Sequence, residues 1–257
     1  MRLNVKNLII WLLIIAVVVT FHIVRRNSTM RGIETVVTGN NICLLTERDV
    51  DSLLIAAYPT LRQTDIGRVE KRKIRQTLLD HPYILDAKVG MSAGGKLQVE
   101  VTQRAPIVRV FFQGNEFYIS NEGTFMPLCA EHFCDIMIGS SEYAEPRLPN
   151  LRAIRLDDTA SEHRSFALES IWRLARFIHD NQQYDGVFDQ VAMTAKGDLV
   201  LTPKLGNTSV IVGDTLQLDE KFENLWVFYD QGVKKTGWDT YKTINLKYKN
   251  QLVGVKR

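Results

Sequence analysis

A chain of 257 residues, 45% of them hydrophobic, is long enough to form one large or two small packed domains. The net charge is +3, but five of the 32 basic residues precede residue 33, and no acidic residue accompanies them. The remaining 27 basic residues are balanced by 29 acidic ones, so the excess positive charge belongs to the N-terminus and the composition argues against a nucleic-acid-binding surface.

The N-terminal segment from Leu8 to Val24 is apolar apart from Thr20 and His22, and as a helix it reaches the shorter end of the lengths that cross a bilayer. A cleaved signal peptide has a shorter apolar core and a small-residue cleavage site, and residues 20–27 contain no such site. We therefore interpret residues 1–30 as a cytoplasmic N-terminus followed by an uncleaved transmembrane signal anchor.

The basic residues beside this segment do not settle its orientation. Their count alone favours a cytoplasmic position for the large domain, because three follow the segment and two precede it. Long domains are nevertheless translocated regardless of such counts. The flanking residues are Arg2 and Lys6 on one side and Arg25, Arg26 and Arg31 on the other.

Two helices are predicted after the anchor. Thr46 and Asp49 form a capping-box pattern ahead of an apolar stripe, which predicts a helix that ends before Pro59. A second helix is expected over residues 67–80. Pro82 stops it, because proline disfavours helical geometry in the residue before it.

Three strands are expected to form a small sheet with these helices. The first lies at 33–37, ahead of both helices. Apolar residues alternate with a period of two over 84–89 and 97–101, which predicts two further strands. Residues 92–95 end in Gly-Gly and supply the turn between them. The predicted order of elements over 31–104 is therefore β-α-α-β-β.

The second of these helices carries a run of basic side chains, at Arg68, Lys71, Arg72, Lys73 and Arg75. Such a run is most often a solvated helix face. The alternative is a docking face that attracts anionic lipid headgroups or an acidic partner segment near the membrane. The pattern alone favours the solvated face, and Arg68, Lys71, Arg72 and Arg75 are the candidate docking residues.

Residues 105–257 are rich in strand patterns and contain two helices. The helices are expected at 163–181 and 216–231, each with an apolar stripe of core-packing type. Residues 129–150 form the most irregular region. Strands are expected at 107–112, 117–120, 124–128, 188–194, 198–203, 208–212, 240–248 and 252–255, the last two as a hairpin. The predicted fold class is α+β: a transmembrane helix, a β-α-α-β-β domain, and a β-rich domain with two packed helices.

Several of these motifs, in this order, resemble the FtsQ/DivIB family of bacterial cell-division proteins. The residues that carry the resemblance are Ile74, Leu78, His81-Pro82-Tyr83-Ile84, Ala87-Lys88-Val89, Leu97 to Val101, Arg104-Ala105-Pro106, Tyr118-Ile119 and Asn121-Glu122-Gly123. Segments 148–151, 206–213 and 244–248 are also similar to the family. The resemblance implies a POTRA domain at 31–104 and a β domain at 105–257.

The resemblance also implies the function and the location of the protein. We expect a non-enzymatic, single-pass protein of the cytoplasmic membrane, with most of the chain on the extracytoplasmic (periplasmic) side and concentrated at the division septum. Its expected partners are bitopic division proteins of the FtsB/DivIC and FtsL type, other divisome components and membrane lipid. No cofactor, small-molecule substrate or nucleic acid is expected.

In this family the last strands of the β domain bind those partners. The corresponding residues of this chain are Leu246, Lys247, Tyr248, Leu252 and Gly254. Tyr248 is the main candidate, because it combines a broad apolar ring with a hydroxyl, a type enriched in interface hot spots. Lys196 is a weaker candidate for a charge contact.

The final strand suggests how a partner is bound. A terminal strand presents unpaired N–H and C=O groups that accept a strand from another protein. Basic residues beside it either protect this edge or pair with an acidic partner segment, and the family resemblance favours the second. These residues are Lys247, Lys249, Lys256 and Arg257.

One catalytic pattern matches by letter. Residues 90–94 fit the Gly-x-Ser-x-Gly nucleophile elbow, with Ser92 at its centre. That elbow needs a helix after it, and a strand is expected here, so we predict a hairpin turn and keep a hydrolase using Ser92 only as a minor alternative. No catalytic residue is assigned.

Three cysteines do not form a disulfide framework. Cys129 and Cys134 can pair in an oxidising compartment, whereas Cys43 is expected as a buried thiol. Cys129, His132 and Cys134 together suggest a metal site, but a fourth ligand is not evident. We therefore expect a loop with or without one disulfide, and no metal.

The competing function is a POTRA-containing envelope protein for protein export or outer-membrane assembly. Such a protein would lead from its POTRA unit into further repeats or a long membrane barrel. Neither pattern is expected after residue 104, so we favour the division protein.

Overall fold

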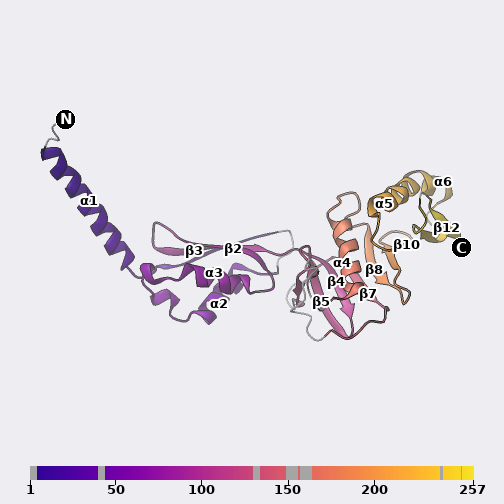
Figure 1. Cartoon of the computed structure of the whole chain (residues 1–257), viewed down its shortest axis with the longest axis horizontal. Helices are drawn as coiled ribbons and strands as arrows, with labels where there is room; N and C mark the ends of the chain where they lie inside the picture. The colour runs from indigo at the N-terminus through magenta and orange to yellow at the C-terminus, as the bar shows by residue number, and fades with distance from the viewer. Residues whose placement is uncertain are drawn as a thin grey trace. The chain divides into compact units, whose positions relative to one another are not determined.

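The computed structural model describes residues 5–39, 44–129, 134–148, 156, 164–237, 240–249 and 251–257. The chain divides into two compact units, residues 1–104 and residues 105–257 (Figure 1). The first unit holds a long N-terminal helix and a three-stranded sheet with two helices. The second holds a nine-stranded sheet with its own helices. The α+β class expected from the sequence is confirmed.

Helix α1 (Val5–Arg26) is the N-terminal apolar helix. Its stretch Ile9–Arg26 has a mean hydropathy of 2.1, and none of that stretch is buried against the rest of the chain. By length and composition it can cross a bilayer. It fits a single-pass membrane anchor and extends slightly beyond the predicted segment 8–24 at both ends.

The sheet of the first unit has the order β1-β3-β2. Strand β1 (Gly32–Thr38) runs parallel to β3 (Lys96–Gln103), and β2 (Ile84–Met91) runs antiparallel to β3. The predicted alternation in β3 is confirmed, because its inward-facing residues are buried and the residues between them are more exposed. The inward-facing residues are Leu97, Val99, Val101 and Gln103.

Two helices pack on this sheet. Helix α2 (Glu47–Ala57) begins with the predicted capping box, in which Thr46 and Asp49 each accept the other's backbone N–H through their side chains. Helix α3 (Lys71–Leu79) buries Ile74 and Leu78. These contacts bury one face of each helix and leave the charged faces in solvent.

The predicted start of the second helix is wrong. Residues Ile66–Arg68 form a short 3-10 turn, and α3 begins only at Lys71. Gly67 is a poor helix former, and the side chain of Arg26 lies directly over it. Arg68 is therefore not on the basic helix but on the turn that precedes it.

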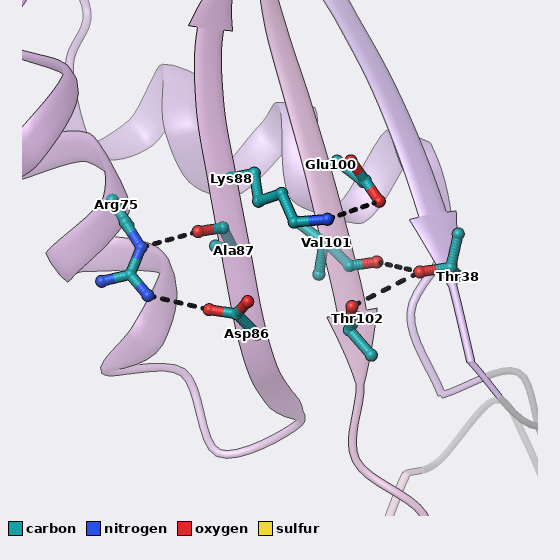
Figure 2. Close-up of polar contacts among 8 residues, drawn as sticks. All are labelled: Thr38, Arg75, Asp86, Ala87, Lys88, Glu100, Val101 and Thr102. Carbon is teal, nitrogen blue, oxygen red and sulfur yellow. Dashed lines mark hydrogen bonds and ion pairs between the residues drawn. The ribbon is translucent and has the colours of Figure 1, made fainter.

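Polar contacts join α3 to the outer strand of the sheet (Figure 2). Arg75 donates from Nε to the Ala87 carbonyl at 2.7 Å and from Nη2 to Asp86 Oδ1 at 2.8 Å. A hydrogen bond from the Ala87 backbone and then the Arg75 guanidinium hold the pKa of Asp86 below its ordinary value. Lys88 and Glu100 form a cross-strand ion pair at 3.2 Å.

Acid is expected to destabilise the first unit through His81. The Tyr83 N–H donates to His81 Nδ1 at 3.3 Å, and burial lowers the pKa of His81 below its ordinary value of 6.5. The unfolded chain therefore binds the proton more readily, and stability falls as the pH drops below about 6.5. His81→Asn keeps a hydrogen-bond acceptor that does not titrate. After correction for intrinsic exchange rates, amide exchange in β2 and β3 should therefore accelerate from pH 7.5 to pH 5 by a smaller factor in this variant than in the native chain. Equal acceleration in both proteins would contradict the assignment.

The second unit contains one mixed sheet of nine strands, in the order β12-β11-β10-β9-β8-β7-β4-β5-β6. The pairs β4/β7, β7/β8 and β10/β11 are parallel, and the others are antiparallel. The strands are β4 (Pro106–Phe112), β5 (Asn115–Ser120), β6 (Phe125–Met126), β7 (Met137–Ser141), β8 (Phe188–Met193), β9 (Leu199–Pro203), β10 (Ser209–Gly213), β11 (Tyr241–Asn245) and β12 (Val253–Lys256).

Strand β7 lies in the region that the sequence left irregular. It pairs in parallel with β4 on one side and β8 on the other, so it sits inside the sheet. A Cβ on Gly139 would lie 3.0 Å from Ile171 and 3.1 Å from Val110, which shows how closely the helix that contains Ile171, α4 (Phe166–His179), approaches here. The strand is short, and both of its partners are distant in sequence, so no local pattern marks it.

Helix α4 (Phe166–His179) packs against β4, β7 and β8, and its N-terminus is capped by Ser165 Oγ, which accepts the Leu168 N–H at 3.0 Å. The helix expected over 216–231 is divided. It consists of α5 (Leu218–Val227), a π turn (Phe228–Gly232) and α6 (Val233–Thr236). The core between the helices and the sheet is one continuous apolar cluster.

The C-terminal hairpin joins the sheet through a short parallel seam. Ser209, Val210 and Ile211 of β10 pair with Thr243, Ile244 and Asn245 of β11. Two hydrogen bonds extend the seam, from the Leu246 N–H to the Ile211 carbonyl at 2.8 Å and from Thr208 Oγ1 to the Tyr241 carbonyl at 2.7 Å. The predicted hairpin of the last two strands is confirmed, since β11 and β12 pair antiparallel.

Candidate partner-binding edge

Strand β12 is the outermost strand at one end of the nine-stranded sheet. It pairs with β11 on one side, and all four of its residues are exposed. Val253 is 40% exposed and Val255 is 53% exposed, which is high for apolar side chains of a strand. An edge with exposed apolar side chains and an uncovered backbone is suited to accepting a further strand.

Tyr248 lies beside this edge, but not on the strand where the sequence placed it. Strand β11 ends at Asn245, and Tyr248 follows in the connection to β12. The predicted strand over 240–248 is therefore too long, because Asn245 turns the chain by accepting the Lys247 N–H through Oδ1 at 2.9 Å. Tyr248 is 52% exposed, so its ring is accessible to a partner.

Lys247 is held in place by an ion pair with Asp198, at 2.8 Å between Nζ and Oδ1. The hydrogen bond from Lys247 to Asp198 raises the pKa of the lysine above its ordinary value. The stem of Lys247 crosses Gly213, where a Cβ would lie 2.7 Å from its Cγ. Lys196 is exposed in the turn that ends at Asp198, so the structure brings this turn and Lys247 to one place.

The other three predicted residues support the edge from within. Leu246 is only 3% exposed, and Leu252 packs against the core. Gly254 faces the ring of Tyr241, and a Cβ there would lie 2.6 Å from the ring. The Leu246 side chain is therefore covered by the chain's own core, and the lack of a side chain at Gly254 allows the close approach of the Tyr241 ring.

A small hollow of about 60 Å³ opens next to Tyr248, between the connection 246–251 and the start of α5. Lys221 lines it and is anchored by Asp214, at 2.6 Å between Nζ and Oδ1. Burial raises the pKa of Asp214, but hydrogen bonds from Lys221 and Leu216 outweigh it and lower the pKa overall. Glu220 also lines the hollow and presents a buried carboxylate oxygen.

Sequence reasoning missed the contribution of α5 to this site. Glu220 and Lys221 fall on a helix whose apolar stripe indicates only core packing, and nothing in the local pattern relates them to Tyr248. The link is the fold, which places the start of α5 against the connection between the last two strands.

The basic residues predicted as a docking face do not form one face. Arg68 lies on the 3-10 turn and pairs with Asp65 at 3.7 Å, and Arg75 is engaged with Asp86. Lys71 and Arg72 are exposed at the start of α3. Of the four predicted residues, these two lie on the exposed surface of α3 and form no ion pair with the described residues.

The other chemical candidates find no support. Ser92 lies in the β2–β3 turn, where its Oγ accepts the Lys96 N–H at 3.0 Å, so the predicted hairpin turn is confirmed and no helix follows it. Cys129 and Cys134 are free thiols, while Cys43 and His132 lie outside the described residues. Burial raises the pKa of Cys134. Among the residues that the structure describes, no cluster of His, Cys, Asp and Glu side chains suits a metal ion.

A single apolar helix ahead of two α+β units, the second ending in an exposed edge strand, fits the class of membrane-anchored binding proteins. A family model described as FtsQ/DivIB, C-terminal related, matches residues 105–255, and the chain belongs to this family. No match is found among curated proteins. The family is a septal, non-catalytic scaffold family, so the protein is a cell-division protein.

Proposed function

We propose that the protein recruits bitopic division proteins of the FtsB/DivIC and FtsL type to the septum and links them to septal wall synthesis. The observation that carries this proposal is the exposed edge strand β12, with Tyr248 and the hollow beside it. A partner strand adds to β12 through backbone hydrogen bonds, and its side chains use Tyr248, Lys247 and Lys196. Leu252 and Gly254 hold the edge in shape.

The first unit is proposed to be a POTRA domain at 31–104 that docks other divisome components. Its order of strand, helix, helix, strand, strand supports this assignment. Lys71 and Arg72, exposed at the start of α3, are the proposed contacts for an acidic segment of such a component. We further propose that the β domain at 105–257 and the first unit both lie outside the cytoplasmic membrane, with α1 as the anchor.

Tyr248→Asp is the test of the edge. The ligand is the complex of the FtsB/DivIC-type and FtsL-type proteins from the same organism. We expect its Kd to rise about 30-fold or more, because loss of an aromatic hot spot costs about 2 kcal/mol. Full-length protein in detergent micelles is used for the titration. Tyr248 is half exposed, so the circular dichroism and the unfolding midpoint should not change.

Phe111→Asp is the matched control, because Phe111 is 47% exposed on β4, which is separated from β12 by five strands in the sheet order. It should leave the Kd unchanged. Native affinity of the Tyr248→Asp protein would remove the assignment of this edge. In cells, a fluorescent fusion at native level should form a band at the division site, and an even distribution through the whole cycle would contradict recruitment to the septum.

A further inference from the structure

The end of α1 runs directly into the first unit through a braced segment, residues 27–31. Thr29 forms an antiparallel bridge with Asp65, and Met30 is only 5% exposed. Backbone hydrogen bonds fix the rest: Ile66 N–H to the Ser28 carbonyl at 2.9 Å, Met30 N–H to the Thr64 carbonyl at 3.1 Å, and Arg31 N–H to the Gly95 carbonyl at 2.9 Å. The turn 62–68 and the hairpin tip 92–96 are thereby tied to the end of the helix.

The last two side chains of α1 bind the same two segments. Arg25 Nη2 donates to the Ser92 carbonyl at 2.9 Å, at the start of the hairpin tip. Arg26 lies across Gly67 so closely that any Cβ there would collide with its Cγ. The turn 62–68 and the hairpin tip 92–96 therefore both contact the end of α1.

These three segments, residues 25–31, 62–68 and 92–96, form what we term the basic collar. It contains six basic residues and one acidic residue, Asp65. Asp65 pairs with Arg68, whose side chain is still 82% exposed. The basic residues are Arg25, Arg26, Arg31, Arg62, Arg68 and Lys96, and all except Arg25 are exposed.

The position of the basic collar at the end of α1 indicates that it faces the membrane surface. Arg25 and Arg26 end a helix whose preceding stretch is mostly apolar, so they lie at the level where a membrane helix leaves the hydrocarbon region. Groups hydrogen-bonded to residues 25–31 are held near that level, and the potential of an anionic surface acts over about one Debye length, roughly 8–10 Å. Guanidinium groups at this depth match the geometry of phosphate oxygens.

We infer that the basic collar binds the phosphate groups of anionic phospholipids in the leaflet from which α1 emerges. This inference goes beyond partner recruitment, since the collar belongs to the first unit and the partner edge to the second. Lipid binding would also explain the basic residues that follow the anchor. Their number alone disfavours an extracytoplasmic location of the large domain. The lipid contact fixes the first unit against the membrane surface through side chains of three segments.

Full-length protein in lipid nanodiscs tests the collar. Amide exchange of residues 62–68 and 92–96 is measured in discs of phosphatidylcholine and in discs with about one third phosphatidylglycerol. We expect exchange to be about threefold or more slower in the anionic discs, because each nearby Lys or Arg is attracted to the anionic surface. Raising the salt from about 0.1 to 0.5 M should remove most of the difference, since it shortens the Debye length from about 10 Å to about 4 Å.

The triple variant Arg62→Gln, Arg68→Gln, Lys96→Gln should lose the difference between the two discs. All three side chains are exposed, so the unfolding midpoint in micelles should stay near the native value. The matched control is Lys204→Gln, Lys234→Gln, Lys235→Gln, which removes the same charge from the second unit. It should keep the full lipid effect, and both triple variants should bind the division partners normally.

Three outcomes would overturn the inference. Exchange could be the same in neutral and anionic discs, or the lipid effect could survive in the collar variant. Alternatively, protection could arise only when poly-glutamate is added to neutral discs, which would assign the collar to an acidic protein segment instead. None of these outcomes involves Tyr248, so the proposed recruitment is tested separately.

Discussion

Phe222→Ala is expected to lower the free energy of unfolding of the second unit by about 3–5 kcal/mol. Phe222 is fully buried, and its ring lies at the centre of an aromatic cluster. The ring centroids of Phe177 and Tyr184 are each 5.0 Å away, and that of Phe188 is 6.0 Å away. Truncation removes these contacts together and leaves a cavity that rigid strands cannot fill.

The measurement is denaturant unfolding of the full-length protein in micelles, followed by tryptophan fluorescence. Trp172 and Trp226 report on the second unit. Val227→Ala is the control, because Val227 is on the same helix but 53% exposed, and it should change the free energy by less than about 1 kcal/mol. A loss of less than about 1 kcal/mol for Phe222→Ala would mean that the cluster is not packed as described.

Gln103→Leu is expected to destabilise the first unit by about 2–5 kcal/mol, because it removes three hydrogen bonds to buried backbone groups. Gln103 is 9% exposed. Its Oε1 accepts the N–H groups of Leu44 and Leu45 at 2.8 and 3.0 Å, and its Nε2 donates to the Leu45 carbonyl at 3.3 Å. One side chain thus holds the end of β3 to the chain that leads into α2.

Amide exchange of Val99 and Val101 in β3 measures this effect, since both residues are buried in the sheet. Gln98→Leu is the matched control, on the same strand but exposed, and it should leave the exchange rates close to native. If exchange in Gln103→Leu is no faster than in the control, the hydrogen bonds of the Gln103 side chain add little to stability.

The first unit was largely predictable because its signals are local. The capping box at Thr46, the stop at Pro82 and the alternation in β3 each lie within one element. The start of α3 was mistaken because the competing contact is distant: Arg26 of the anchor covers Gly67. A periodic pattern of basic and apolar residues cannot register such a contact.

The second unit shows the limits of pattern more clearly. Strand β7 has partners from β4 and β8, far away in sequence, and Gly139 serves a close approach that no local rule predicts. At the edge, the family resemblance proposes Tyr248 as a partner contact. The ion pair between Asp198 and Lys247 cannot be predicted in this way, because it depends on two turns that lie close together only in the folded chain. The assignment of Leu246 to a partner contact stays a prediction, and its side chain is buried in the core.

The parallel seam between β10 and β11 makes the C-terminal hairpin a separable cooperative unit. Three residue pairs, two further hydrogen bonds and the Lys247–Asp198 ion pair hold it to the sheet, whereas six residue pairs join β4 to β5. Such a segment opens in sub-global fluctuations well before the whole domain unfolds. We expect a partner strand to add to β12 only when the hairpin is paired with β10, so mass action should couple its binding to the pairing of β10 with β11. Binding at the edge of the sheet is therefore expected to stabilise the pairing of β10 with β11.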